Sequence, residues 1–557
     1  MIKSNILLIE PGYRNKYPPL GLMKLASYHR DRGDSVKFYK DFGKPASILL
    51  QAWDRVYVTT LFSFEWKRIA RAIDFAIQVA GNQPERVFVG GIAASLMHDE
   101  FVRETRWTGV RFIAGLLDGP PASALRLSSE DGYLGADDLV GESIETRVPD
   151  YTILEHTDYI YPVHDAYFGY ASRGCIRKCH FCGVPKLEGA QREMPPLSNL
   201  VSGIAENHGV KKDLILMDNN VTASARYKEV IAEIRDLGFK PGATLERDGK
   251  QTKRRVDFNQ GVDARILAKS PMYLKEMSTI CISPLRIAFD HIGVRKVYET
   301  SVRMAADNGI TSLSNYMLYN FKDTPVDLYT RMKLNIALNE EIGVRIWSFP
   351  MRYQPVTLKD RSHVGEHWNR YYLRTFQIML QATHGVVSGS AAFFNRAYGE
   401  DKDAFMRLLS YPHGFIFHRT YYENDRDYGV GPSSSIRDEY ETLRRKMTKG
   451  QEAELLEHLA TPIGGEKTRR EYYNRIANTR GVDALVREVI SFHTLDTKTK
   501  VDKVPDSKIL PIFSSLNTDP ILPNEEEIVE DSGLYDQEGD AGECQEPEGI
   551  ASVAKSA

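Results

Sequence analysis

The stretch "AYFGYASRGCIRKCHFCG", residues 166–183, is the key to interpreting the rest of the chain. Its apolar, aromatic first half predicts a buried β-strand, and three cysteines follow that strand directly: Cys175, Cys179 and Cys182. The chain has 557 residues and five cysteines, so most of its thiols lie in this one loop. Thiols clustered in this way indicate a metal centre or a redox site rather than a disulfide framework, and they suit a reducing cytoplasm.

Three kinds of site use closely spaced thiols. A zinc site would need a fourth ligand; His180 is adjacent, but no second C-x2-C pair exists, because the other cysteines are Cys281 and Cys544. A redox C-x-x-C pair would leave Cys175 without a role. A [4Fe-4S] cluster held by three thiolates would leave one iron open, and an open iron is a site for chemistry.

Strand-like runs alternate with helical segments on both sides of the cysteines. Within residues 166–358 six runs have this character: "AYFGYASRG", "DLILMDNN", "RVDFNQG", "LRIAFD", "TSLSNYMLYN" and "VRIWSFP". Six βα repeats predict a parallel barrel or most of one, a partial (βα)6 barrel, with its chemistry at the carboxyl ends of the strands.

A C-x3-C-x2-C motif with an aromatic residue before the last cysteine, placed after the first barrel strand, resembles the radical S-adenosylmethionine (SAM) superfamily. The resemblance covers roughly residues 160–355. It implies that Cys175, Cys179 and Cys182 hold a [4Fe-4S] cluster whose open iron binds SAM. One electron would cleave SAM to methionine and a 5'-deoxyadenosyl radical, which abstracts hydrogen from a substrate that the sequence does not identify. The two remaining cysteines are too few for a second cluster.

The resemblance also assigns polar residues after the other strands to SAM. The family's Gly-Gly-Glu-like segment after the second strand reads "MDNN" here. "SNYMLYN", residues 314–320, lies where the family packs adenine, and Arg265 would pair either with the SAM carboxylate or with Asp290. The expected cofactor-binding residues are Asp218, Asn219, Asn259, Gln260, Asp263, Arg265, Asp290, Asn315 and Asn320. No residue is assigned a catalytic role.

Residues 1–120 predict a separate α/β domain with an open parallel, Rossmann-like sheet, from the strand-like runs "NILLIE", "RVYVTTLF" and "RVFVGG". An α/β domain in this position resembles the cobalamin-binding class, in which the His of an Asp-x-His-x-x-Gly loop ligates cobalt. Here that loop reads "EPGYRNKYPPLG" and has no His. We therefore expect a relict of this fold rather than bound cobalamin, with base-off cobalamin as the alternative. The crevice at the strand ends would be lined by Thr59, Thr60, Ser63, Gly90 and Gly91.

The other segments predict less specific structure. Residues 121–165 form a connector, 359–496 a helical domain, and 497–557 a disordered acidic tail. Between residues 521 and 557 there are 11 acidic residues and one basic residue, although the formal net charge of the whole chain is only -3. No apolar run reaches the roughly 18 residues of a membrane helix, so no membrane partner is expected. The expected partners are a substrate and an electron donor such as flavodoxin or ferredoxin.

Two alternative functions stay open at this point. The first is a cobalamin-dependent methyltransferase on the same scaffold. The second is an RNA-binding module with a structural cluster, which would use a predicted basic hairpin, "LERDGKQTKRR", containing Lys250, Lys253, Arg254 and Arg255. Four basic residues in a hairpin are more often a solvated loop, so no nucleic-acid partner is expected.

Overall fold

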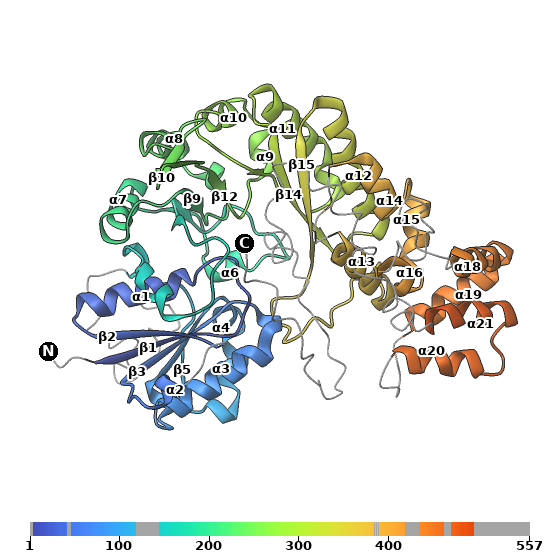
Figure 1. Ribbon diagram of the computed structural model, residues 1–557, viewed down its shortest axis with the longest axis horizontal. Coiled ribbons are helices and arrows are strands. Elements are labelled where there is room, and N and C mark those ends of the chain that lie inside the picture. The colour runs from blue at the N-terminus through green and yellow to red at the C-terminus, as the bar shows by residue number, and fades with distance from the viewer. Residues whose placement is uncertain are drawn as a thin grey trace. The chain divides into compact units, whose positions relative to one another are not determined.

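The computed structural model describes residues 4–41, 46–117, 144–383, 385, 387, 389–417, 434–461 and 469–494 (Figure 1). The described residues form two compact units. The first contains the chain up to Trp368 and the segment Thr383–Met406, and the second contains Asn369–Ala382 and the described residues from Arg407 onward. Most of the predicted connector and the whole predicted acidic tail lie outside the described residues, and the predicted domain boundaries remain predictions.

The amino-terminal part of the first unit is a five-stranded parallel sheet in the order β2-β1-β3-β4-β5 (Figure 1). Its strands are β1 (Asn5–Glu10), β2 (Ser35–Lys40), β3 (Arg55–Thr60), β4 (Val87–Gly91) and β5 (Arg111–Phe112). Leu7 and Ile9 pack in one core with α3 (Trp66–Val79). Ile6 and Leu8 alternate to the opposite face, which α1 (Leu20–Asp31) covers. The strand order reverses between β1 and β3, which is where open α/β sheets bind ligands.

The carboxyl end of β4 is closely packed against β3. Thr60 Oγ1 donates to the Gly90 carbonyl at 2.9 Å and accepts from the Ala94 amide at 2.9 Å. Gly91 has φ +99°, and a Cβ added there would lie 2.4 Å from the Thr60 carbonyl oxygen. These polar groups of the predicted crevice are therefore hydrogen-bonded to one another.

Gly91→Ala is expected to lower the free energy of unfolding by about 3 kcal/mol or more, because left-handed strain adds to a backbone clash. Gly81→Ala is the matched control: Gly81 has φ +72° and nothing within 4 Å of the added Cβ, so only the strain of about 1–2 kcal/mol applies. Thermal unfolding of both variants measures the difference. Equal losses in the two variants would show that the contact with Thr60 is not restrictive.

The middle of the first unit contains six parallel strands with helices between them. They are β6 (Ala166–Gly169), β9 (Asp213–Leu216), β12 (Val256–Phe258), β13 (Leu285–Arg286), β14 (Ser312–Tyr319) and β15 (Arg345–Arg352). They form two three-stranded sheets, ordered β12-β9-β6 and β13-β14-β15, which isolated parallel bridges from Val256 to Ile282 and from Val262 to Ile287 connect. All six predicted strands are present at their predicted places.

The helices that follow these strands are α7 (Leu197–His208), α8 (Tyr227–Asp236), α9 (Ala264–Leu267), α10 (Met272–Met277), α11 (Arg295–Asp307) and α12 (Pro325–Ile342). Two antiparallel pairs interrupt the alternation. One is the hairpin of β10 (Thr244–Arg247) and β11 (Lys250–Lys253), which the sequence predicted. The other joins β7 (Ser172–Arg173) to β8 (Arg192–Glu193) on either side of the cysteines, and the sequence did not indicate it.

The regular structure of the described residues from Arg370 onward is mainly helical. Its helices in the first unit are α14 (Ala391–Tyr398) and the start of α15 (Lys402–Leu409). The second unit contains α13 (Arg370–Ala382), α16 (His413–Phe417), α18 (Ser434–Lys446), α19 (Lys449–Ala460), α20 (Arg469–Asn478) and α21 (Ala484–Ser491). Its core is aromatic: the Tyr371 hydroxyl donates to the Tyr411 carbonyl at 2.6 Å and lies 2.7 Å from His493 Nδ1. Among the residues described, no helix combines the length and apolarity needed to cross a membrane.

Candidate functional site

The three cysteines lie on a loop between β7 and the short helix α6 (Val184–Leu187), at the carboxyl end of β6. All three thiols are free and half-buried. No group of three or more His, Cys, Asp or Glu side chains within the described ranges converges on a single metal ion. A [4Fe-4S] cluster does not require such convergence, because each thiolate binds a different iron atom.

Backbone amides point at two of the sulfur atoms. The Arg177 amide donates to Cys175 Sγ at 3.3 Å, and the Val184 amide donates to Cys182 Sγ at 3.4 Å. Burial raises the pKa of the Cys179 and Cys182 thiols, so binding of a cluster must displace protons. Amide donors to sulfur stabilise the bound thiolates and tune the reduction potential of a cluster. The donor set therefore fits a three-thiolate [4Fe-4S] cluster.

The loop begins at a glycine that no other residue can replace without strain. Gly174 has φ +77°, and an added Cβ would lie 2.3 Å from the Ala190 carbonyl oxygen. Its amide donates to Glu188 Oε2 at 2.8 Å, and the Cys175 amide donates to the Gly189 carbonyl at 3.3 Å. The segment that follows α6 thus fixes the start of the cysteine loop.

Four charged side chains form what we call the buried charge network: Lys24, Glu145, Arg173 and Glu188. Ion pairs join Lys24 to Glu145 at 3.0 Å, Arg173 to Glu145 at 3.1 Å and Arg173 to Glu188 at 3.0 Å. Each side chain is at most 7% exposed. Burial alone would raise the pKa of Glu145, but Lys24 and Arg173 outweigh it and hold the pKa below its usual value. The network connects α1 of the amino-terminal sheet to the strand that precedes Cys175.

Asp218 lies just after β9, is buried, and forms hydrogen bonds to the start of β7, the strand that contains Arg173. Its oxygens accept hydrogen bonds from the Ala171 amide at 2.9 Å, the Ser172 amide at 2.6 Å and the Ser172 hydroxyl at 2.7 Å. Burial raises the pKa of Asp218 to about 6. Asn219 Nδ2 donates to Glu188 Oε2 at 3.0 Å. Both residues were predicted to contact SAM; in the structure they make contacts that hold the cysteine loop in place.

Asn259 and Gln260 follow β12. The Asn259 side-chain amide donates to the hydroxyl of Tyr17, a residue of the loop after β1. The Tyr316 hydroxyl donates to the Asn259 backbone carbonyl at 3.1 Å. Gln260 is exposed and donates to Asn259 Oδ1 at 3.0 Å. The amino-terminal domain therefore contacts the end of a barrel strand through Tyr17.

Asp263 joins two arginines beside the thiols. Arg177 Nε donates to one of its oxygens at 2.7 Å, and Arg265 Nε donates to the other at 2.7 Å. Burial alone would raise the pKa of Asp263, but the hydrogen bonds from these arginines lower it. Arg265 also interacts with the Cys179 thiol, and burial raises the pKa of nearby Asp290 to about 6. In the structure the ion-pair partner of Arg265 is Asp263 rather than Asp290.

Asn315 and Asn320 are buried and bonded within the fold. Asn315 Nδ2 donates to the Tyr298 hydroxyl of α11 at 2.7 Å, on the helix side of β14. Asn320 accepts from the Gly365 amide at 2.7 Å and donates to the carbonyl groups of Tyr353 and His363. Asn320 thus fastens the segment that follows β15. The structure brings neither residue into a described contact with the cysteine loop.

The predicted basic hairpin is only partly free for a ligand. Arg254 lies over the Phe239 ring at 3.8 Å, and Arg255 pairs with Asp213 at 3.1 Å. Lys250 and Lys253 remain exposed on β11. Two exposed lysines form a small basic surface, which agrees with a solvated hairpin.

The loop after β1 determines how well the amino-terminal domain suits cobalamin. Residues 11–19 include no His or Cys that would ligate cobalt. Glu10, at the end of β1, accepts from Lys40 at 2.9 Å and from the Tyr161 hydroxyl. Tyr13 is buried, and its ring packs edge-on against Phe62 with centroids 6.0 Å apart. The switch point between β1 and β3 is lined by these side chains and supplies no cobalt ligand from this loop.

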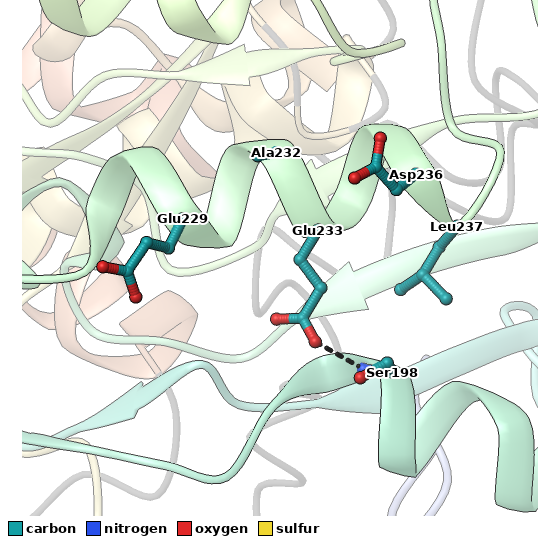
Figure 2. A pocket seen from close by; sticks show the side chains of 6 residues that line it. All are labelled: Ser198, Glu229, Ala232, Glu233, Asp236 and Leu237. Carbon is teal, nitrogen blue, oxygen red and sulfur yellow. Dashed lines mark hydrogen bonds between the residues drawn. The ribbon is translucent and has the colours of Figure 1, made fainter.

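A surface pocket lies between α7 and α8, on the outside of the barrel (Figure 2). It is lined by Ser198, Glu229, Ala232, Glu233, Asp236 and Leu237. Glu233 accepts a hydrogen bond from the Ser198 amide at 2.8 Å and so caps the start of α7 (Figure 2). None of the predicted site residues lines this pocket, so it is separate from the candidate site.

Comparisons with known proteins give one local sequence match. No protein-family model matches the chain. Over 120 residues the chain is 27% identical to the ribosomal protein uS12 methylthiotransferase RimO of Chlorobium phaeobacteroides. The match covers 20% of this chain, and the chain spans about a quarter (27%) of that relative's length.

Solved structures of two further proteins are similar at low identity. The radical SAM methyltransferase TsrM from Kitasatospora setae, determined with cobalamin and a [4Fe-4S] cluster bound, has a TM-score of 0.43 and 13% identity over 64% of this chain and 78% of its own. The cobalamin-dependent SAM radical enzyme OxsB has a TM-score of 0.43 and 12% identity over 96% of this chain and 83% of its own. The expectation that cobalamin is absent gains no support from these comparisons.

The sequence motif and its structural setting agree. Three free thiols follow the first of six parallel strands, an aromatic residue precedes the last of them, and that residue, Phe181, packs on Phe321 with ring centroids 5.8 Å apart. These features are similar to those of radical SAM enzymes, and the local sequence match is to a methylthiotransferase.

Proposed function

We propose that this protein uses one [4Fe-4S] cluster, held by Cys175, Cys179 and Cys182, to cleave SAM and start a reaction by hydrogen abstraction from an unidentified substrate. The observation that carries the proposal is the cysteine loop itself: three free thiols at a strand end, with backbone amides donating to two sulfurs. When bound, the cluster supplies the single electron that splits SAM into methionine and a 5'-deoxyadenosyl radical.

The chain's own residues position that chemistry. Asp218 and the buried charge network hold the strand before Cys175. Asp263 orients Arg177 and Arg265, whose positive charges lie beside the thiols. Asn219, Gln260, Arg265 and Asp290 are the predicted SAM contacts that lie close to the loop or at the barrel mouth, and we retain them as proposed contacts.

The amino-terminal domain contributes by covering the strand ends. Tyr17 contacts Asn259, and a Cβ added to Gly183 in the cysteine loop would lie 2.8 Å from the Leu96 side chain. A domain that excludes water from a radical intermediate prevents side reactions. We therefore propose the division into a covering domain over residues 1–120 and a barrel over residues 166–358, in a reducing cytoplasm that keeps the thiols free.

The direct test is product analysis after anaerobic reconstitution and reduction. The proposed function predicts 5'-deoxyadenosine and methionine from SAM, even without substrate, because uncoupled cleavage requires the cluster and SAM but no bound substrate. Chromatography separates 5'-deoxyadenosine from S-adenosylhomocysteine. Loaded, reduced protein that forms neither product would contradict the proposal.

A cobalamin-dependent methyltransferase is the second candidate. The observation that favours it is the strand order β2-β1-β3-β4-β5, an open sheet whose switch point suits a nucleotide-like ligand. Because residues 11–19 contain no His, the form proposed for this candidate is base-off cobalamin without a His ligand from this loop. Cobalamin absorption in the purified protein, with S-adenosylhomocysteine among the products, would establish this function in place of the first.

A further inference from the structure

Asn320, which directly follows β14, is buried in a left-handed backbone conformation. Its φ is +66°, and the residue is 0% exposed. Among the described residues other than glycine, Asn82 and Asp248 also have a positive φ, but both are exposed. A left-handed backbone costs free energy at a non-glycine residue, and in a protein interior it persists only where the surrounding contacts hold it. The contacts of Asn320 therefore indicate what this conformation serves.

The side chain of Asn320 makes three hydrogen bonds to one segment. Its oxygen accepts from the Gly365 amide at 2.7 Å, and its nitrogen donates to the backbone carbonyls of Tyr353 and His363 at 3.1 and 3.2 Å. We call residues 353–365 the strap. A Cβ added to Gly365 would lie 2.8 Å from the Asn320 carbonyl oxygen, so the two backbones are in close contact. Asn320 thus holds both ends of the strap beside the end of β14.

A series of ring contacts connects the strap to the cysteine loop. Tyr353 packs on Phe321 with ring centroids 4.6 Å apart, and on His363 with ring centroids 5.1 Å apart. Phe321 packs in turn on Phe181 at 5.8 Å. Phe181 is bonded directly to Cys182 in the chain. The strap therefore supports, through Tyr353 and Phe321, the ring that precedes this thiol.

The middle of the strap contacts the amino-terminal domain. The Arg361 guanidinium lies 4.0 Å from the centroid of the Phe64 ring. The Lys359 ammonium lies 4.1 Å from the centroid of the Trp66 ring and 3.5 Å from a carboxylate oxygen of Glu100. Solvent reaches these pairs, so each contributes little to stability. The buried hydrogen bonds of Asn320 are therefore expected to contribute more to holding the strap than these surface pairs.

We propose that Asn320 is a positioning residue, which holds the strap and thereby keeps Phe181 in place beside Cys182, so that water and small solutes reach the cluster slowly. The proposal rests on the proposed function, because it assumes a cluster on the three thiols. Asn320 acts through the strap and the rings of Tyr353 and Phe321. Exclusion of water from the site protects reactive intermediates from side reactions.

The first test measures the strap itself in the metal-free, full-length protein. Asn320→Gly suits the left-handed backbone but removes all three side-chain hydrogen bonds. Trypsin cleavage after Lys359 and Arg361, identified by mass spectrometry, should become about tenfold faster, because the loss of buried hydrogen bonds raises the population of locally open forms. Asn335→Ala is the matched control, since Asn335 is buried on α12 and donates to the Ser348 hydroxyl at 2.7 Å rather than to the strap. It should leave cleavage at these two sites unchanged.

The second test measures access to the cluster in the anaerobically reconstituted protein. The release of iron to the chelator bathophenanthroline disulfonate is normalised to the iron bound at the start. The rate should be about tenfold higher in Asn320→Gly and in Tyr353→Ala, which removes the ring that supports Phe321. Tyr353→Phe keeps that ring, so it should release iron at the wild-type rate, as should Asn335→Ala.

The outcomes separate the two claims. If the wild-type protein takes up no iron on reconstitution, the proposed function fails. If iron is bound, but Asn320→Gly releases it no faster than Asn335→Ala, the proposed function stands and the role of Asn320 is wrong, even where trypsin cleaves the strap faster. Equal rates of iron release in Tyr353→Ala and Tyr353→Phe would also contradict the role of the strap, and this comparison does not depend on the folding of the Asn320 variant.

Discussion

Cys175→Ala is expected to reduce bound iron from about four atoms per chain to nearly none and to abolish SAM cleavage. The variant leaves two thiols, Cys179 and Cys182. Two thiolates are too few to prevent the cluster from losing iron when the protein is exposed to air or to a chelator. Anaerobic reconstitution, iron and sulfide analysis, and chromatography of the SAM products measure both effects.

Cys281→Ala is the matched control for this experiment. Cys281 is also a free, half-buried thiol, but it lies in the barrel outside the cysteine loop. Its removal should leave iron content and SAM cleavage at the wild-type level. Wild-type iron in Cys175→Ala would show that the loop does not hold the cluster, and about eight irons in the wild type would reveal a second cluster.

Arg173→Met is the substitution with the largest expected effect on stability. It leaves Glu145 and Glu188 buried without their shared cation, and breaking a buried ion pair from one side costs about 3–5 kcal/mol. Gly174 and Cys175 follow directly in the chain, so iron content should fall together with Tm. Arg173→Lys keeps the positive charge but lacks the planar guanidinium that pairs with Glu145 and Glu188 at once. It should therefore recover part of the loss in Tm and part of the loss in iron content.

Arg303→Met serves as the control for the loss of an arginine ion pair. Arg303 pairs with Glu341 through two hydrogen bonds of 2.8 and 2.7 Å, but both side chains are exposed, so solvent compensates for the loss. Thermal unfolding should therefore separate the two variants clearly. If Arg173→Met unfolds at the same temperature as Arg303→Met and binds full iron, the buried charge network does not position the loop.

Much of the fold could be predicted from the sequence because its strands are apolar runs that end at polar or glycine residues. The six barrel strands and three strands of the first sheet were predicted in this way, whereas the hairpin was predicted from the polar, basic segment "LERDGKQTKRR". β2 was not recognised, because "SVKFYK" alternates lysines with apolar residues. The two-residue strands β7 and β8 carry no periodic signal at all, and only the folded chain pairs them.

The candidate site was harder to predict than the fold. The cysteines were recognised by their spacing, which is a local property. Asp218 follows a strand as a SAM-binding residue would, but its burial and its hydrogen bonds to Ser172 depend on the arrangement of two strands. The partner of Arg265 was open between SAM and Asp290, and Asp263, two residues away in the chain, was overlooked. Arg173 was not singled out from the sequence. One of its partners, Glu145, precedes it by 28 residues, and the other, Glu188, follows the three cysteines.

Electron paramagnetic resonance of the reduced, reconstituted protein with and without SAM tests directly whether SAM binds the cluster. We expect the signal of one reduced [4Fe-4S] cluster that changes shape when SAM is added, because SAM would bind the iron that no cysteine occupies. The signal should be absent in Cys175→Ala and unchanged in Cys281→Ala. A cluster signal in the wild type that SAM does not alter would contradict the account.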